Sequence, residues 1–214
     1  ELPHMLPTKE KWEEIVSSLG ISNKDKIVIY DNSDVLSSCR GWYNFIYFGH
    51  ERELVSVLDG GLKKWKIENK ITTNEKTNIL KSKYIAKENK HLVKNINEIN
   101  DNIKRNNFKV IDARSRERFE GILPDPRKNV RSGSIPNSLC LPFKEVINSN
   151  DNTFKNKNEI SKKFDEIIDL SEKNRVFSCG SGITACVLSL AYSLVNNTYS
   201  PTVYDGSWAE YGKL

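Results

Sequence analysis

Hydrophobic residues follow two spacings along the chain, and together these spacings predict alternating strands and helices. Short runs rich in Val, Ile, Phe and Tyr predict buried strands at 27–30, 55–58, 108–111, 138–141, 176–177 and 202–204. Apolar residues three or four positions apart predict amphipathic helices at 9–19, 38–48, 92–103 and 159–168. The almost wholly apolar run at 185–195 predicts a buried helix. This alternation is typical of an α/β fold built on parallel sheets.

The order of these elements occurs twice, so the chain contains an internal repeat. The segment 203–211 resembles 57–65, and 176–179 resembles 28–31. In both copies a short strand leads into a loop and a helix, and a later strand ends in an Asp-Gly turn. We therefore expect two tandem domains, each a parallel sheet flanked by helices.

The repeat and the polar segments give the domain boundaries. We predict a partial first domain at 1–75, a polar linker at 76–90 and a second domain at 91–214. Asp31 occupies in the first copy the position that Cys179 occupies in the second. A carboxylate cannot act as a thiol nucleophile, so only the second domain is expected to carry thiol chemistry.

The loop that follows the strand at 176–177 is the strongest candidate for chemistry. Cys179 ends this strand, Gly180 and Gly182 follow, and the buried helix then begins. Glycines let successive N–H groups converge on one point, and a helix N-terminus adds partial positive charge, so a thiolate here should be stabilised. The other interpretation is a buried structural cysteine beside a glycine-rich turn. Cys186 lies two helical turns further on and is expected to be a core residue.

Cysteine phosphatases have a similar strand, loop and helix, but the comparison disfavours phosphate as a substrate. Their loops carry an arginine at the sixth position after the cysteine, where it clamps the phosphate dianion. The corresponding residue here is Ala185, and the loop offers the neutral Ser181 in place of a cation. A dianion beside a thiolate would therefore be poorly bound.

The loop Cys-Gly-Ser-Gly-Ile-Thr-Ala at 179–185 resembles that of 3-mercaptopyruvate sulfurtransferases, members of the two-domain rhodanese family. Thiosulfate sulfurtransferases typically carry a basic pair where Gly180 and Ser181 stand. The resemblance covers nearly the whole chain and includes further matching motifs at 112–121, 124–127, 133–136 and 204–208.

The resemblance implies roles for two arginines on a Pro-containing loop. In the family, the equivalents of Arg118 and Arg127 hold the carboxylate and keto group of the substrate. Planar guanidinium groups suit an α-keto carboxylate, and Pro124 and Pro126 would stiffen the turn that presents Arg127.

The reaction implied by the resemblance is sulfur transfer through a Cys179 persulfide, with release of pyruvate and no cofactor. The loop residues Gly180, Gly182 and Ile183 would surround the sulfur, and the hydroxyls of Ser181 and Thr184 would relay or stabilise charge. The acceptor would be thioredoxin, a small thiol or cyanide, in a ping-pong scheme. A thiosulfate sulfurtransferase and a non-catalytic rhodanese-like interaction module remain open as alternatives.

Three departures from the family pattern affect this interpretation. Glu117 replaces a glycine beside Arg118 and could compete for its charge, and Ser134 replaces a usual histidine. The opening strands and helix of the first domain have no counterpart, and in the family that part supplies an Asp and a His near the thiol. We expect an uncovered sheet edge there, which favours self-association or a separate chain that fills the gap.

Composition narrows the remaining possibilities. The 214 residues carry a net charge of +5, but the basic residues lie in solvated polar segments without interleaved aromatics, so nucleic acid is not an expected partner. Three isolated histidines suggest no metal site, and no apolar run is long enough to span a membrane. Four cysteines without framework spacing fit a reducing compartment. We expect a cytoplasmic protein, and a mitochondrial location stays open because the N-terminus of the parent protein looks absent.

Overall fold

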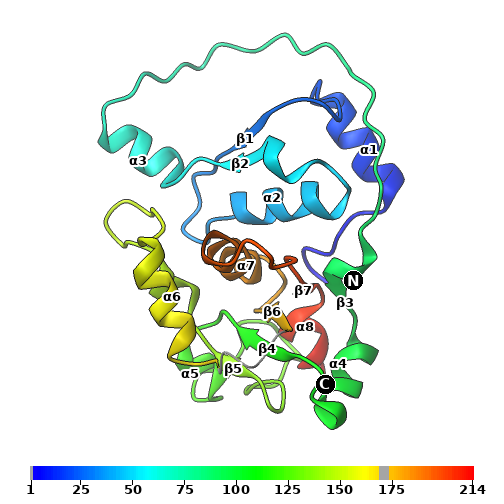
Figure 1. Cartoon of the computed structure of the whole chain (residues 1–214), viewed down its shortest axis with the longest axis vertical. Helices are drawn as coiled ribbons and strands as arrows, with labels where there is room; N and C mark the ends of the chain where they lie inside the picture. Colours follow the sequence, from blue (N-terminus) through cyan, green and yellow to red (C-terminus); the bar gives the residue numbers. More distant parts are fainter. Residues whose placement is uncertain (1, 169–173) are drawn as a thin grey trace.

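The structure is a computed structural model that describes residues 2–168 and 174–214. Figure 1 shows two sheets with helices around them. The strands are β1 Ile27–Ile29, β2 Val55–Val57, β3 Val93–Lys94, β4 Lys109–Asp112, β5 Leu139–Cys140, β6 Arg175–Ser178 and β7 Val203–Tyr204. The α-helices are α1 Lys9–Ser18, α2 Ser38–Tyr47, α3 Gly61–Ile67, α4 Ile96–Arg105, α5 Arg116–Phe119, α6 Lys157–Asp165, α7 Thr184–Val195 and α8 Ser207–Tyr211. Three 3-10 helices cover Arg52–Leu54, Lys90–Leu92 and Phe143–Val146.

Both sheets are parallel, which confirms the α/β architecture expected from the repeat. The first sheet pairs β1 with β2, and the second has the order β3-β7-β6-β4-β5. In the second sheet Ile111 of β4 lies opposite Phe177 of β6, and Phe177 lies opposite Val203 of β7. Cys179 follows β6, so it stands at the carboxyl edge of the central strand, where ligands of open α/β sheets bind.

Side-chain caps fix where several helices begin. The Thr8 hydroxyl accepts a hydrogen bond from the Lys11 N–H at the start of α1, as the sequence predicts. The Asn95 side chain accepts from the backbone of α4, while Glu98 accepts from the Asn95 N–H, which completes a capping box. These caps satisfy N–H groups that the first turn of a helix leaves without partners.

One core joins the two repeats. Helices α2 and α7 lie side by side at the centre of the molecule, as Figure 1 shows. Cys39 of α2 and Cys186 of α7 are both fully buried in a hydrophobic cluster to which the two repeats contribute. The first repeat therefore packs, through α2, against α7, the helix that follows the Cys179 loop.

Several local predictions are wrong. The strand at 27–30 is not buried on both faces, because Val28 is 64% exposed and Tyr30 is 59% exposed. The equivalent Val176 is 2% exposed, because Ile99 of α4 and Trp208 of α8 belong to the cluster that covers it. Among the described residues no helix covers Val28 in the way that α4 covers Val176, so a hydrophobic face stays open.

Other differences concern element boundaries. The helix expected from residue 92 begins at Ile96, because Leu92 ends a 3-10 turn and Val93 belongs to β3. The segment that carries Arg118, expected to be part of a Pro-containing loop, contains the short helix α5. On the helix predicted at 9–19, Ile15 and Leu19 are exposed and not buried. Ile167 packs against the core as expected, although it lies beyond the end of α6.

The linker is also less solvated than its polar composition suggests. Its early part runs as a long arc between α3 and α1 (Figure 1), but Tyr84 and Ala86 are buried in the hydrophobic core. The Tyr84 N–H donates to the Ser17 hydroxyl, and the Ala86 N–H donates to the Glu13 carboxylate. The domain boundaries at 75 and 90 stay a prediction. In the described chain no helix is long and apolar enough to cross a membrane.

Candidate active site

The loop from Cys179 to Ile183 connects β6 to α7 and forms the centre of the candidate active site. Cys179 is 2% exposed, and Gly180, Ser181 and Gly182 are buried with it. Ile183 and Thr184 are half-buried at the start of α7. The structure thus brings together all the loop residues that the sequence analysis selects.

Helix α8 holds the loop through its backbone. The Trp208 N–H donates to the Cys179 carbonyl and the Ala209 N–H donates to the Gly180 carbonyl, each at 2.9 Å. Because a peptide plane directs its C=O and the following N–H to opposite sides, these bonds turn the loop N–H groups inward. Accordingly, the Ser181 N–H lies 3.5 Å from the Cys179 Sγ. This arrangement favours negative charge on the sulfur.

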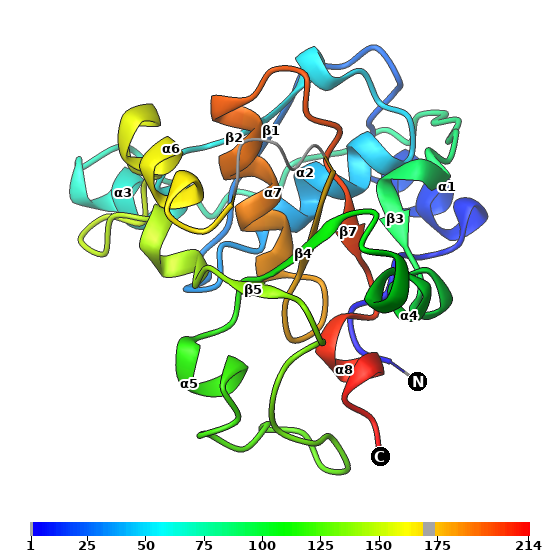
Figure 2. The same ribbon diagram turned by 60° about the horizontal axis from the view of Figure 1, so that its bottom comes forward.

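Two arginines from α5 and the following loop approach the same point. Figure 2 shows α5, this loop and α8 on the side of the sheet where the β6–α7 loop lies. A β-carbon built on Gly180 would stand 3.3 Å from both terminal nitrogens of Arg127 and 3.5 Å from Nη2 of Arg118. Both guanidinium groups are therefore next to Gly180, the residue that follows Cys179. A side chain at position 180 would push both guanidinium groups away from this position.

Asp125 orients both arginines. Its side chain is 1% exposed and contacts Nη2 of Arg118 at 2.6 Å and Nη1 of Arg127 at 3.2 Å. Burial acts to raise the pKa of Asp125, but the hydrogen bonds from the Arg127 N–H and from Arg118 outweigh it, so the pKa is lowered. The expected competitor Glu117 is not the carboxylate that pairs with Arg118. The sequence analysis did not select Asp125, although its place between the two prolines is a usable indication.

His4 is a further site residue that the sequence analysis missed. Its Nδ1 lies 2.9 Å from the Ser181 hydroxyl, across 177 positions of sequence. The sequence analysis treats His4 as isolated and assigns a histidine near the thiol to an absent segment. The contact corrects that view, because a histidine stands at the loop in this chain. Contacts over such a separation leave no periodic pattern that a single sequence could reveal.

The other three cysteines differ from Cys179 in their surroundings. Burial raises the pKa of Cys186 to about 12 and that of Cys140 to about 11. Burial also raises the pKa of Cys39 well above its ordinary value. The Cys186 thiol donates to the Gly182 carbonyl at 3.2 Å and is fully buried, which confirms that it is a core residue. All four cysteines are free thiols.

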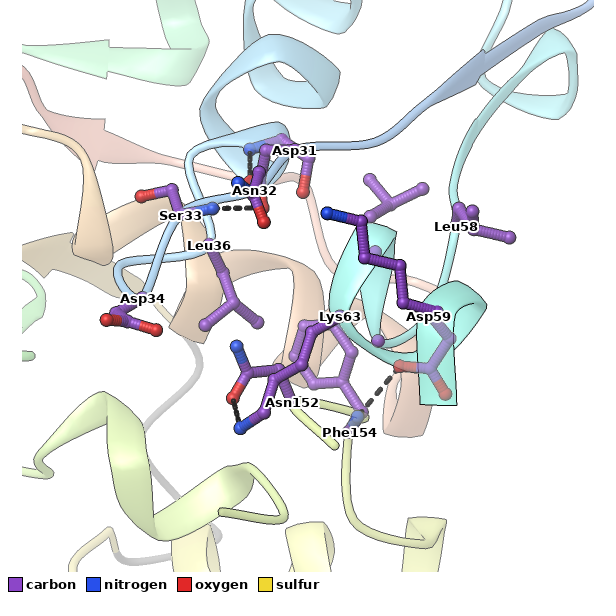
Figure 3. Close-up of a pocket in the computed structure, with 15 residues that line it drawn as sticks. Asp31, Asn32, Ser33, Asp34, Leu36, Leu58, Asp59, Lys63, Asn152 and Phe154 are labelled. Atoms are coloured by element: carbon purple, nitrogen blue, oxygen red, sulfur yellow. Dashed lines mark hydrogen bonds between the residues drawn. The ribbon is translucent and has the colours of Figure 1, made fainter. Parts of the chain in front are cut away.

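In the first repeat, the carboxylate of Asp31 binds the N–H and hydroxyl groups of the equivalent loop. Asp31 accepts hydrogen bonds from the Ser33 N–H, the Ser37 hydroxyl and the Ser38 N–H. Figure 3 shows Asp31 and Ser33 at a pocket of about 330 Å³, with Lys63 and Asp59 on another wall. The three donors bonded to Asp31 are therefore not available to an external anion. Among the described residues no group of His, Cys, Asp and Glu is placed to hold a metal ion.

Comparison with known proteins agrees with this geometry. The family model for the rhodanese-like domain matches residues 3–68 and 95–214. The chain belongs to the rhodanese family. Each matched region contains one copy of the repeat, and the second region contains the Cys179 loop.

Individual relatives match nearly the whole of this chain. It is 38% identical to the mitochondrial thiosulfate/3-mercaptopyruvate sulfurtransferase 1 of Arabidopsis thaliana, over 98% of this chain and 60% of that protein. It is 38% identical to the 3-mercaptopyruvate sulfurtransferase of Mus musculus, over 97% of this chain and 69% of that protein. Its structure resembles the Tum1 protein of Saccharomyces cerevisiae with a TM-score of 0.87 and 27% identity, over 98% of this chain and 73% of that one. The chain thus spans 60 to 73% of these relatives.

Proposed function

We propose that this protein is a sulfurtransferase that moves sulfane sulfur from 3-mercaptopyruvate, through a Cys179 persulfide, to a thiol or cyanide acceptor. The observation that carries the proposal is the approach of Arg118 and Arg127 to Gly180, beside a cysteine whose loop N–H groups face inward. This arrangement can hold a carboxylate and an anionic sulfur at the same time. The relatives named as 3-mercaptopyruvate sulfurtransferases support it.

The first half-reaction forms the persulfide. The Cys179 thiolate attacks the sulfur of 3-mercaptopyruvate, an S–S bond forms, and the C–S bond breaks. The electron pair of that C–S bond goes to the enolate of pyruvate, which takes one proton at carbon, so no external oxidant or reductant is needed. Arg118 and Arg127 bind the carboxylate and keto oxygen and stabilise the charge that develops on the enolate.

Hydroxyl and imidazole groups would move the proton. The Ser181 hydroxyl, bonded to His4, would pass a proton between the reacting sulfur and the enolate carbon, with Thr184 as a weaker donor at the start of α7. Gly180, Gly182 and Ile183 contribute the backbone that encloses the persulfide. In the second half-reaction a thiolate, from thioredoxin or a small thiol, attacks the outer sulfur and restores Cys179. We place this reaction in a reducing compartment, the cytoplasm.

Thiosulfate is the second candidate donor, and one observation favours it. Two guanidinium groups stand close to Cys179, so the sulfonate of thiosulfate would meet cations there even though Gly180 and Ser181 provide none. The name of the Arabidopsis relative includes both donors. We propose mercaptopyruvate as the preferred donor because planar guanidinium groups fit its carboxylate and keto oxygen together.

Steady-state kinetics on the two donors tests the proposal. Pyruvate release from 3-mercaptopyruvate and thiocyanate formation from thiosulfate would be measured with the same cyanide concentration. The expected result is a higher kcat/KM for 3-mercaptopyruvate. Equal or faster turnover of thiosulfate would overturn the donor assignment, and absence of turnover with both donors would favour the non-catalytic module.

A further inference from the structure

Arg40, from the repeat without a catalytic cysteine, reaches the catalytic loop of the other repeat. It lies on α2 and is 6% exposed. Its Nη1 donates to the Gly182 carbonyl at 3.0 Å, and its Nη2 donates to the His4 carbonyl at 3.0 Å. The same Nη2 stands 2.7 Å from the Asp205 carboxylate. One buried guanidinium therefore touches the loop, the segment that carries His4, and the turn before α8.

The contact with Gly182 fixes a peptide plane of the loop. The carbonyl of Gly182 points outward to Arg40, so the N–H of Ile183 in the same plane points to the opposite side. The Gly180–Ser181 plane, two peptide units earlier, behaves in the same way: the Gly180 carbonyl accepts a hydrogen bond from α8, and the Ser181 N–H then faces the Cys179 sulfur. Arg40 thus orients the Ile183 N–H in the same way that α8 orients the Ser181 N–H.

The backbone at Gly182 is adapted to this contact. Its φ is +80°, which side chains rarely adopt, and a β-carbon there would lie 2.7 Å from Nη1 of Arg40. Among the described residues, the remaining hydrogen-bond donor to the Gly182 carbonyl without Arg40 would be the thiol of Cys186, a weak donor at 3.2 Å. A glycine free to rotate with a weakly held carbonyl would not keep the Ile183 N–H in place.

The Arg40 guanidinium forms an ion pair with Asp205 of the second repeat. The Asp205 side chain is 5% exposed and its other carboxylate oxygen accepts a hydrogen bond from the Leu6 N–H at 2.8 Å. A buried charge pair of this kind is costly to break, because removal of one partner leaves the other charge unpaired. The pair therefore keeps the guanidinium in one position against the loop.

We propose that Arg40 is a positioning residue for sulfur transfer: the non-catalytic repeat holds the Cys179 loop in its anion-binding shape through the Gly182 carbonyl. The inference rests on the proposed function for its role in turnover. Its effect on the sulfur is independent of any donor, because it acts on the loop of the free protein.

The test compares Arg40→Gln and Arg40→Lys with the matched control Arg52→Gln. Arg52 also belongs to the first repeat and also donates across to a second-repeat carbonyl, that of Tyr199 at 3.1 Å. Alkylation of Cys179 by iodoacetamide would be followed by peptide mass spectrometry from pH 5 to pH 9, beside pyruvate release from 3-mercaptopyruvate. Thermal unfolding of each variant gives the folded fraction.

Arg40→Gln should alkylate Cys179 about tenfold more slowly at pH 7, with a profile moved to higher pH and an unchanged rate limit in alkali. The other groups around the loop, Arg118, Arg127, His4, Asp205 and Cys186, are kept in every variant. Arg40→Gln also removes a positive charge, so Arg40→Lys, which keeps the charge, is the variant whose shift reports the loop. Arg52→Gln should leave the profile unchanged. Arg40→Lys keeps the charge but cannot donate to the carbonyl and the carboxylate in the same fork, so it should fall between Arg40→Gln and the parent.

An unchanged Cys179 profile in a folded Arg40 variant would overturn the inference, as would an equal shift in Arg52→Gln. If Arg40→Gln does not fold, the Arg40→Lys profile decides. Failure of the proposed function looks different: the parent would release no pyruvate, while the Arg40 variants would still shift the alkylation profile.

Discussion

Replacing Arg118 with alanine isolates the contribution of one guanidinium to donor binding. Nη2 of Arg118 is 2.6 Å from Asp125 and 3.5 Å from the β-carbon position of Gly180, so the group is already in place before a donor arrives. Within the described chain its buried Nε has no hydrogen-bond partner, which leaves a donor available for the substrate. A hydrogen bond to a charged group contributes about 1.5–3 kcal/mol.

That range predicts a decrease of roughly 10- to 160-fold in kcat/KM for 3-mercaptopyruvate, at about 1.36 kcal/mol per factor of ten. The assay is pyruvate release over a range of donor concentrations. Arg116→Ala is the matched control, because Arg116 is on the same short helix but pairs with Glu145 and is 50% exposed. A kcat/KM within twofold of the parent in Arg118→Ala, or an equal loss in Arg116→Ala, would refute the assigned role.

Asp125, the Ser181–His4 hydrogen bond and the open face at Val28 can each be tested by one substitution. The lowered pKa of Asp125 means that its ion pairs stabilise the fold above its ordinary pKa of 3.8 and that this stabilisation disappears as the pH falls through the lowered value. Asp125→Asn should therefore reduce Tm at pH 7 but converge with the parent in acid, and equal Tm values at pH 7 would contradict this. Ser181→Ala, which removes the hydrogen-bond partner of His4, should decrease kcat by a larger factor than it changes KM in the pyruvate assay. An unchanged kcat would exclude proton transfer through Ser181. The open face at Val28 should make two copies of the chain associate, and Val28→Glu should shift sedimentation toward the monomer; a monomeric parent would argue against this.

The sequence predicts the strand, loop and helix around Cys179 well, because these elements depend on short-range patterns in the chain. The strand that ends at Cys179, the glycine-rich loop and the buried helix α7 are consecutive in the chain, and each has its own hydrophobic pattern. The internal repeat also identifies Asp31 as the position that makes the first copy unable to carry sulfur. The roles of Arg118 and Arg127 came from family resemblance, and no periodicity indicated them.

The groups that support the site could not be predicted in this way. Arg40 and His4 meet the loop across 142 and 177 residues, and Asp125 becomes important only because a fold buries it between two arginines. Such contacts depend on how α2 packs against α7, and single-sequence patterns carry no information about that packing. The sequence predicts a buried strand at 27–30, but Val28 is exposed. The reason is the same, because the burial of a strand depends on whether a helix packs over it.

The most direct test of the account is the mass of the Cys179 peptide after the protein has been treated with 3-mercaptopyruvate and separated from free donor. The account predicts one added sulfur atom on Cys179, removed by cyanide or a small thiol, and no addition in Cys179→Ser. It also predicts no added sulfur on Cys39 and Cys186, because burial raises the pKa of both thiols and so disfavours the thiolate that must attack the donor. An unmodified Cys179 with continued pyruvate release, or a sulfur atom found on another cysteine, would contradict the proposed function.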